Sequence, residues 1–283
     1  VSWKVLRRSN VRGIMRPTQT KTSVRQPAVA GFFYPDDPLQ LRETVSSLLA
    51  HAKTMPLGEH RIMAFIVPHA GYIYSGPVAA VAYRTLAQIS RVRRIVLIGP
   101  SHRVYFRGIA LPTATAFRTP LGDVTIDEEL RQRIAASQGV VVSDDAHRHE
   151  HSLEVQLPFL QAIFDSFTLL PLVAGDATAS DVAAVLAATD DEDTVLLVSS
   201  DLSHYLPYER AQQIDALTSE AILRREPTLT PQQACGAVPI NGLLHLARLR
   251  DARVEELARC NSGDTAGDRQ RVVGYGAYAV YEA

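Results

Sequence analysis

The chain has 283 residues, of which 46% are hydrophobic, and a formal net charge of −1. This composition is typical of a globular protein that folds without disulfide cross-links. No apolar run approaches the roughly 20 residues that cross a bilayer, and the basic N-terminus is not followed by the apolar core of a secretory signal. Two cysteines argue against a disulfide framework. These features predict a cytoplasmic protein without a membrane partner.

Charge is unevenly distributed along the chain. Residues 1–25 carry seven basic side chains and no acidic one, so a charge of −8 falls on the remaining residues. Such an arm can touch an acidic surface, but termini of this kind are more often disordered. We therefore predict a basic, disordered arm over residues 1–25 and a folded domain over 26–283. The mildly acidic body argues against nucleic acid as the main substrate.

Strands and helices are predicted to alternate along the folded part. Short apolar runs predict strands at 61–67, 94–99, 108–112, 140–142 (an edge strand), 168–173, 194–198, 253–260 and 271–281. Helical spacing predicts helices at 39–51, 78–86, 127–136, 152–160 (interrupted by a proline), 179–189, 208–225 and 241–250. No Pro/Gly/Ser-rich linker separates them. The pattern predicts one α/β domain whose mostly parallel or mixed sheet is flanked by helices.

Three histidines each follow one of these buried strands. His69 comes after the strand 61–67, His102 after 94–99 and His204 after 194–198. Because α/β sheets bind ligands at the carboxyl ends of their strands, we expect these imidazoles to converge on one metal or acid/base site. A single histidine in such a place can equally be a polar loop residue.

Cys235 offers a soft ligand, and Gly236 beside it permits close approach of the backbone. Two histidines and a thiolate suit zinc, Fe(II) or copper, whereas magnesium and calcium prefer oxygen ligands. Alternatively, Cys235 is simply a small buried residue. Asp201, three residues before His204, is predicted to orient that imidazole and fix its tautomer.

The segment 147–151 contains three histidines and Glu150. It predicts either a solvated loop or a wall of the site, in which Glu150 or His151 hydrogen-bonds a ligand imidazole. Tyr72 and Tyr74 follow His69 closely and are predicted to line a pocket for a planar substrate, or else to pack against the next helix. The chain contains no P-loop, no G-x-G-x-x-G, no G-x-S-x-G and no H-E-x-x-H motif.

Several short segments, taken together and in this order, carry a family resemblance. They are PAVAGFFYP at 27–35, PHAGY at 68–72 with SG at 75–76, GPSH at 99–102, EHSLE at 150–154, SSDLSH at 199–204 and CGAVP at 235–239. In these the chain resembles the Memo family, which includes the bacterial and archaeal members called AmmeMemoRadiSam system protein B. The resemblance covers about residues 26–283.

The resemblance implies the fold of class III extradiol ring-cleaving dioxygenases, in which two histidines and a carboxylate hold Fe(II). Carried over residue by residue, it implies His69, His102 and Cys235 as metal ligands, with Asp201 and His204 in the same pocket. His204 takes the place of the acid/base histidine. Cys235 departs from the glutamate of the dioxygenases, and its thiolate favours copper or a different iron redox poise over ring cleavage.

Two classes of function follow. The first is a redox protein that uses iron or copper, with zinc less favoured, and whose substrate is an unknown small molecule; extradiol cleavage is its narrower form. The second is a non-catalytic module that holds a peptide, a metal or a partner. The family name implies an association with an AMMECR-like protein and a radical SAM enzyme. A zinc hydrolase is a third, less favoured alternative.

Overall fold

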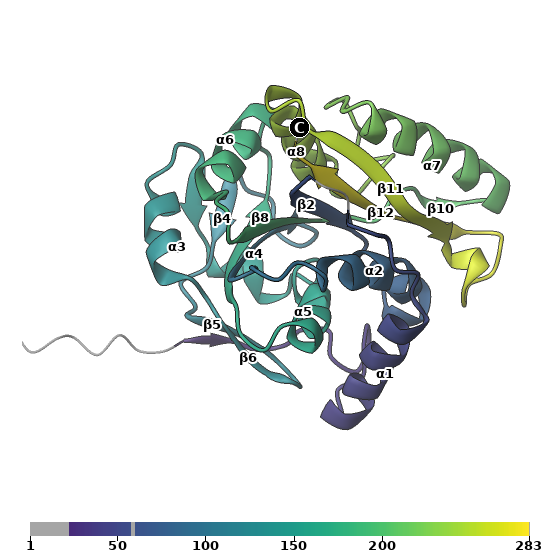
Figure 1. The fold of residues 1–283 in the computed structure, drawn as a ribbon, viewed down its shortest axis with the longest axis horizontal. Coiled ribbons are helices and arrows are strands. Elements are labelled where there is room, and N and C mark those ends of the chain that lie inside the picture. The colour runs from purple at the N-terminus through teal and green to yellow at the C-terminus, as the bar shows by residue number, and fades with distance from the viewer. Residues whose placement is uncertain (1–22, 58–59, 283) are drawn as a thin grey trace, which may run out of the picture.

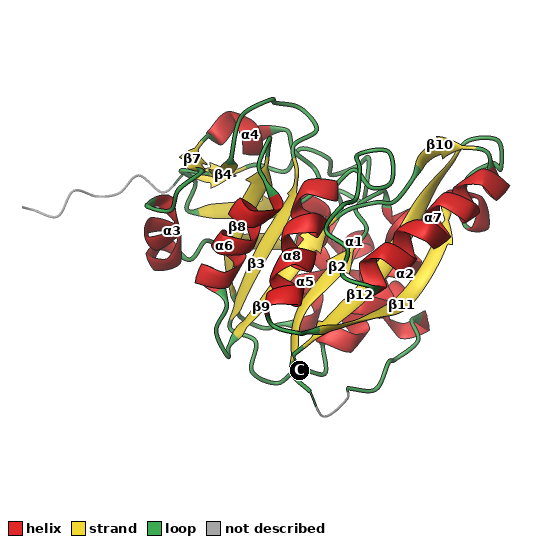
Figure 2. Cartoon of the chain, turned by 90° about the horizontal axis from the view of Figure 1, so that it is seen from above, coloured by secondary structure: helices red, strands yellow, loops and turns green. Residues whose placement is uncertain are grey.

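The computed structural model describes residues 23–57 and 60–282. The strands of its large sheet are β2 (Ile62–Val67), β3 (Arg94–Pro100), β4 (Ile109–Leu111), β7 (Val140–Val142), β8 (Thr168–Ala174), β9 (Thr194–Ser199), β10 (His204–Leu206), β11 (Arg253–Asn261) and β12 (Val272–Tyr281). In this described part, the nine strands run in the order β10-β12-β2-β9-β3-β8-β4-β7, with β11 also paired to β12 (Figures 1 and 2). A small second sheet contains β1 (Val24–Arg25), β5 (Ala116–Thr119) and β6 (Gly122–Thr125).

The centre of the large sheet is parallel. β2 pairs with β9, β9 with β3 and β3 with β8, all in parallel. Nearly every residue of these four strands is buried, which is why their sequences are continuous apolar runs rather than alternating ones. β12 joins antiparallel to β2, and β7 forms the far edge, as predicted for 140–142.

Helices cover both faces of the sheet, as Figure 1 shows. One face is covered by α1 (Pro38–His51), α2 (Tyr72–Leu86) and α5 (Leu157–Ile163), and the other by α3 (Glu128–Ala135), α6 (Ala179–Thr189), α7 (Tyr208–Leu223) and α8 (Ala237–Leu249). The remaining short helices are α4 (Asp144–Arg148), η1 (Glu154–Gln156) and η2 (Ser262–Asp264). Successive side chains of β2, such as Phe65 and Ile66, enter opposite cores. The predicted α/β fold with a mixed sheet is confirmed.

Two helices begin earlier than predicted, α8 at Ala237 instead of residue 241 and, with a larger shift, α2. α2 starts at Tyr72 instead of residue 78, and the amide of Ser75 already donates to the carbonyl of Gly71 at 3.1 Å. Pro77 therefore lies inside the helix, where it lacks the N–H that would bond the carbonyl of Ile73. The apolar contacts of the following turns outweigh this loss, since Val78, Ala79 and their neighbours are buried.

The predicted boundary between arm and domain shifts toward the N-terminus. Residues 1–22 of the predicted arm lie outside the described residues, but Val24 and Arg25 form β1 beside β5. Arg25 is 8% exposed and pairs with the buried carboxylate of Glu154. It belongs to the folded part because a buried carboxylate needs a charged partner.

A buried histidine makes stability depend on pH. His147 in α4 is 2% exposed, donates from Nε2 to the carbonyl of Ala110 at 3.0 Å, and has no partner at Nδ1. Burial lowers the pKa of His147 from 6.5 to about 4. Below pH 6.5 the unfolded chain therefore binds this proton first, so stability is lost as the pH falls from 6.5 toward 4.

We expect this residue to remove about 2 kcal/mol of unfolding free energy between pH 7 and pH 5. Urea unfolding of the metal-free protein at both pH values, beside a His147→Leu variant, measures this loss. Other buried histidines titrate in both the wild type and the variant. The contribution of His147 is therefore the difference between the two proteins in how much unfolding free energy each loses from pH 7 to pH 5. Equal losses would contradict the prediction.

Candidate metal centre

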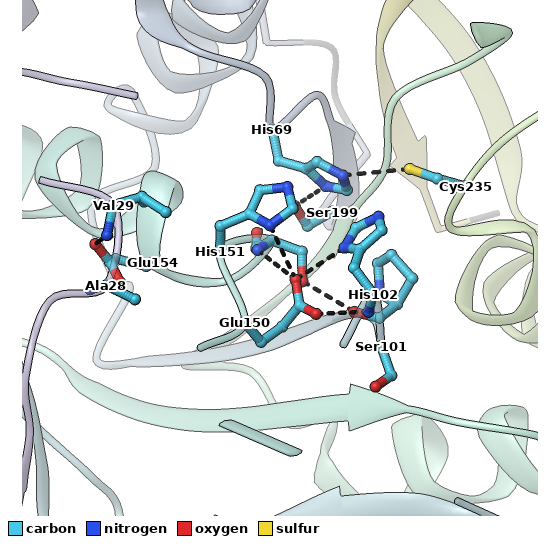
Figure 3. A network of polar contacts seen from close by, with 12 residues as sticks. Ala28, Val29, His69, Ser101, His102, Glu150, His151, Glu154, Ser199 and Cys235 are labelled. Atoms are coloured by element: carbon cyan, nitrogen blue, oxygen red, sulfur yellow. Dashed lines mark hydrogen bonds and ion pairs between the residues drawn. The ribbon is translucent and has the colours of Figure 1, made fainter. Parts of the chain in front are cut away.

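The sheet order brings the predicted histidines together. β9 lies between β2 and β3, and His69 and His102 follow the carboxyl ends of these two outer strands. A third imidazole, that of His151, approaches from the segment between α4 and η1. One ligand nitrogen from each of the three histidines lies within 4.8 Å of the others, and Figure 3 shows their rings grouped above Glu150.

The tautomer of His69 follows from its neighbours. The hydroxyl of Ser199 donates to the carbonyl of Ser152 at 2.6 Å, so its oxygen must accept the proton of His69 Nδ1, 3.0 Å away. Nε2 is therefore left unprotonated toward the site. The amide of His69 also donates to Asp201 at 2.7 Å. His69 is 2% exposed, so these bonds hold its ring rigidly.

Glu150 accepts two hydrogen bonds from His102. Its carboxylate accepts the backbone N–H of His102 at 2.6 Å and the Nδ1 proton at 2.9 Å, and the N–H of Ser152 at 2.9 Å. Burial raises the pKa of Glu150, but the bonds from His102 and Ser152 outweigh it and bring the pKa to about 2. The same carboxylate lies 3.4 Å from Nδ1 of His151. The predicted hydrogen bond between Glu150 and an imidazole of the site is thus present, with the Nδ1–H of His102 as the donor.

Cys235 lies on the other side of His69. Its Sγ is 3.2 Å from Nε2 of His69 and accepts the backbone N–H of Asp201 at 3.3 Å. A Cβ on Gly236 would lie 2.6 Å from the side chain of Ser200, so only glycine allows this close approach, as predicted. Burial raises the pKa of the Cys235 thiol to about 12, and the charge of Asp201 adds to this.

Asp201 does not orient His204, contrary to the sequence prediction. Nδ1 of His204 instead donates to the carbonyl of Leu202, two residues earlier in the chain, at 2.8 Å. Asp201 turns toward the backbone of His69. Burial raises the pKa of Asp201 to about 7, although the bond from His69 lowers it. Because Nδ1 of His204 carries its proton, Nε2 is the basic nitrogen in the neutral ring.

Two adjoining cavities open onto the centre. The larger, about 800 Å³, is lined by Phe33, His69, His102, His151, Asp201, His204, Tyr205, Leu206, Arg210, Ile214, Pro231, Gln232, Gln233 and Cys235. The second, about 580 Å³, shares Phe33, His151, Asp201, His204 and Tyr205 with the first and adds Tyr74, Arg271 and Tyr275 among others. All the predicted ligands therefore face one large space.

Tyr72, predicted to line the pocket, does not. It is 5% exposed, its hydroxyl donates to the carbonyl of Val155 at 2.7 Å, and its ring packs against Phe159. The early start of α2 explains this, because Tyr72 becomes a helical residue that faces the core. Tyr74 does line the second cavity.

Sequence reasoning missed two aromatic residues of the cavity wall. The ring of Phe33 lies 4.8 Å from that of His151, and Tyr205, which is 62% exposed, lines both cavities. Tyr205 has a left-handed backbone (φ 57°), which is uncommon outside glycine and often marks a functional site. Phe33 lies in the segment 27–35 that carries part of the family resemblance, but its loop composition gives no sign of a cavity wall, and no sequence signal identifies Tyr205.

The donor set fits a transition metal. Hydrogen bonds hold the Nδ1 protons of His69 and His102, so Nε2 of each neutral ring carries no proton, and Nε2 of His69 lies 3.2 Å from Sγ of Cys235. Burial and then the nearby imidazoles hold the pKa of His69 well below its usual range, and burial lowers that of His151 to about 4. These rings are thus neutral at pH 7. Nitrogen and sulfur donors suit iron, copper or zinc better than magnesium or calcium.

Comparison with known proteins places this chain in a family. A family model described as Memo-like protein matches residues 25–279. A MEMO1 family protein of Metallosphaera sedula is 36% identical over 277 residues (89% of this chain, 97% of the relative), and one of Ignicoccus hospitalis is 38% identical over 278 (90% and 97%). The crystal structure of an uncharacterized protein from Escherichia coli K12 matches with a TM-score of 0.54 at 14% identity, over 77% of this chain and 99% of that one. That likeness shows the fold alone.

Proposed function

Because this chain belongs to the Memo-like protein family, we propose that it is a metal-dependent redox protein that binds iron or copper through His69, His102 and Cys235. The observation that carries the proposal is the cluster of imidazoles within 4.8 Å of one another at the wall of a cavity of about 800 Å³. Imidazoles suit iron, copper and zinc, the nearby thiol of Cys235 adds a soft donor, and the cavity leaves room for a substrate. We propose that its substrate is a small molecule, whose identity is unknown.

Cys235 is the third ligand in this proposal. Two donors bound to one ion at about 2.1 and 2.3 Å lie roughly 3–4 Å apart, and Sγ of Cys235 lies 3.2 Å from Nε2 of His69. A buried, neutral thiol must lose its proton to bind, and the charge of the ion supplies the driving force. His151 is the competing third donor, because its nitrogen meets the same distance limit as those of His69 and His102.

The protein's own groups then have separate tasks. When bound, iron or copper supplies electron transfer and activation of a small ligand such as O₂. His204 accepts a proton at Nε2 from a group in the cavity, since its Nδ1 proton is held by Leu202. Asp201, whose pKa burial raises to about 7, holds or releases a proton close to neutral pH. Phe33 and Tyr205 shape the space above these groups.

Three narrower or competing functions share this site. Extradiol ring cleavage is the dioxygenase form of the proposal, and a thiolate in place of a carboxylate makes it the less favoured form. A zinc hydrolase would use the same donors without redox chemistry. A non-catalytic module that holds a peptide, or that works with AMMECR-like and radical SAM proteins, would bind metal or partner without turnover.

The cytoplasmic location stays a prediction. None of the helices in residues 23–57 and 60–282 has the length and hydrophobicity to cross a bilayer.

The first experiment measures metal content after purification without oxygen and after loading with Fe(II), Cu(I) or Zn(II). We expect near-stoichiometric iron or copper. Loading with Co(II) then identifies the ligands, because a thiolate ligand adds an intense charge-transfer band that Cys235→Ser abolishes. If His151→Ala removes binding and Cys235→Ser does not, His151 is the third ligand.

Activity is tested on the loaded protein by O₂ consumption with catechols and by ester hydrolysis with zinc. Yellow ring-fission product supports the dioxygenase form, and zinc-dependent hydrolysis that His204→Ala abolishes supports the hydrolase. A wild-type protein that takes up none of the three metals contradicts the proposal. The cavity is then better explained as a binding site for a partner or peptide.

A further inference from the structure

Arg25 lies beneath the segment that carries Glu150 and His151. Its guanidinium, 8% exposed with the rest of the residue, donates from Nε to the carbonyl of His147 at 3.1 Å and from Nη2 to the carbonyl of Glu150 at 2.5 Å. Its Nη1 forms an ion pair with Glu154. One side chain from the start of the domain thus binds three points of the segment 147–154.

Glu154 ties the same segment to the N-terminal residues. Its carboxylate is fully buried and accepts the N–H of Ala28 at 2.7 Å, the N–H of Val29 at 3.0 Å and the hydroxyl of Tyr34 at 2.6 Å, besides the guanidinium of Arg25. Figure 3 shows Glu154 with Ala28 and Val29, apart from the imidazoles. The N-terminal residues Arg25, Ala28, Val29 and Tyr34 are therefore bound to the segment that carries Glu150 and His151.

Glu150 is held at both of its ends by these contacts. Its carboxylate bonds His102 and Ser152 on the side of the centre, and its peptide carbonyl bonds Arg25 on the other side. That carbonyl belongs to the peptide unit that begins His151. A shift of this peptide would therefore move the carboxylate that orients His102 and the imidazole of His151 together.

We propose that Arg25 is a positioning residue of the metal centre, which fixes the Glu150–His151 peptide so that the imidazoles of His102 and His151 face the ion. This inference rests on the proposed metal binding. Arginine suits the task because its planar fork of donors reaches three acceptors at once, whereas the ammonium of lysine is a compact point charge. Groups that orient metal ligands in this way typically change metal affinity 10- to 100-fold when they are removed.

The test compares Arg25→Met and Arg25→Lys with Arg118→Met as a matched control. Arg118 lies in β5, next to β1, and its exposed guanidinium pairs with Asp123 away from the centre. The probe is Co(II) alone, added to the full chain at a temperature where circular dichroism shows each protein folded. The dissociation constant and the ligand-field spectrum are both recorded.

We expect Arg25→Met to weaken Co(II) binding about 10- to 100-fold and to change the energy or intensity of the ligand-field bands. Arg25→Lys keeps a charge beside Glu154 but cannot serve all three acceptors, so we expect it to restore much of the thermal stability and little of the spectrum. Arg118→Met should match the wild type in both. If Arg25→Met does not fold, Arg25→Lys decides the question by itself.

Two results would overturn this inference in distinguishable ways. Arg25 variants that melt earlier but bind Co(II) with wild-type affinity and spectrum would show that Arg25 only stabilises the fold, and the proposed function would survive. A wild-type protein that binds neither Co(II) nor any of Fe(II), Cu(I) and Zn(II) would instead remove the proposed function, and the positioning role with it.

Discussion

A His69→Ala variant is expected to bind Co(II) or Fe(II) at least about 100-fold more weakly than the wild type, a loss of about 2.7 kcal/mol of binding free energy. His69 is the imidazole that contacts each of the other candidate donors. Its Nε2 faces Cys235 at 3.2 Å, and its ring lies edge-on to those of His102 and His151 at 5.2 and 5.3 Å. Alanine removes the donor and also leaves the hydroxyl of Ser199 without its imidazole partner.

The measurement is an anaerobic metal titration followed by absorbance, beside His149→Ala as the control. His149 belongs to the histidine-rich segment 147–151, which also carries His151, but it is exposed and is absent from the cluster of ligand nitrogens. We expect it to bind metal as the wild type does. Equal losses in the two variants would mean that the segment attracts metal nonspecifically, and wild-type affinity in His69→Ala would place the ion elsewhere.

Replacing Glu154 by alanine is expected to lower the unfolding free energy by about 3–5 kcal/mol, the largest loss of stability among the variants described here. The substitution leaves the buried guanidinium of Arg25 without its counter-ion and removes the acceptor of the Ala28 N–H, the Val29 N–H and the Tyr34 hydroxyl. Uncompensated buried charge and unpaired buried donors are both costly.

Urea unfolding of the metal-free protein measures this loss, with Glu128→Ala as the matched control. Glu128 also pairs with an arginine, Arg131, but its side chain is 47% exposed. An exposed pair of this kind contributes about 1 kcal/mol or less, because water and ions screen it. If the two variants lose similar amounts, Glu154 is not the anchor of the N-terminal segment that its contacts indicate.

Local patterns in the chain predict most elements of the fold. The helix expected at 179–189 is α6, with the same bounds, and its start is marked by the Thr178 and Asp181 capping box. The strand expected at 194–198 is β9, one residue longer. Prediction fails at Tyr72, because a proline five residues later suggested a helix start at residue 78. Gly71 and the buried positions that follow instead allow α2 to begin earlier.

The site was predictable where its residues end strands. His69 and His102 follow apolar runs, and the position of parallel strand ends at one sheet edge brings them together. The wall of the cavity was not predictable in this way. Phe33, Tyr205 and the partner of His204 depend on loop conformations, and nothing in the spacing of the chain determines which carbonyl or ring a loop places near an imidazole.

By itself, the sequence determined the alternation of strands and helices and the edge of the sheet at which His69 and His102 meet, because these depend on hydrophobic periodicity and on residue types at strand ends. Only the tertiary structure decided how the donors are held. The links from Glu150 to His102, from Arg25 to the carbonyl of Glu150 and from Glu154 to the N-terminal residues join segments far apart in the chain. Such contacts have no period and no local signal, since they form only when the packed core brings their backbones together.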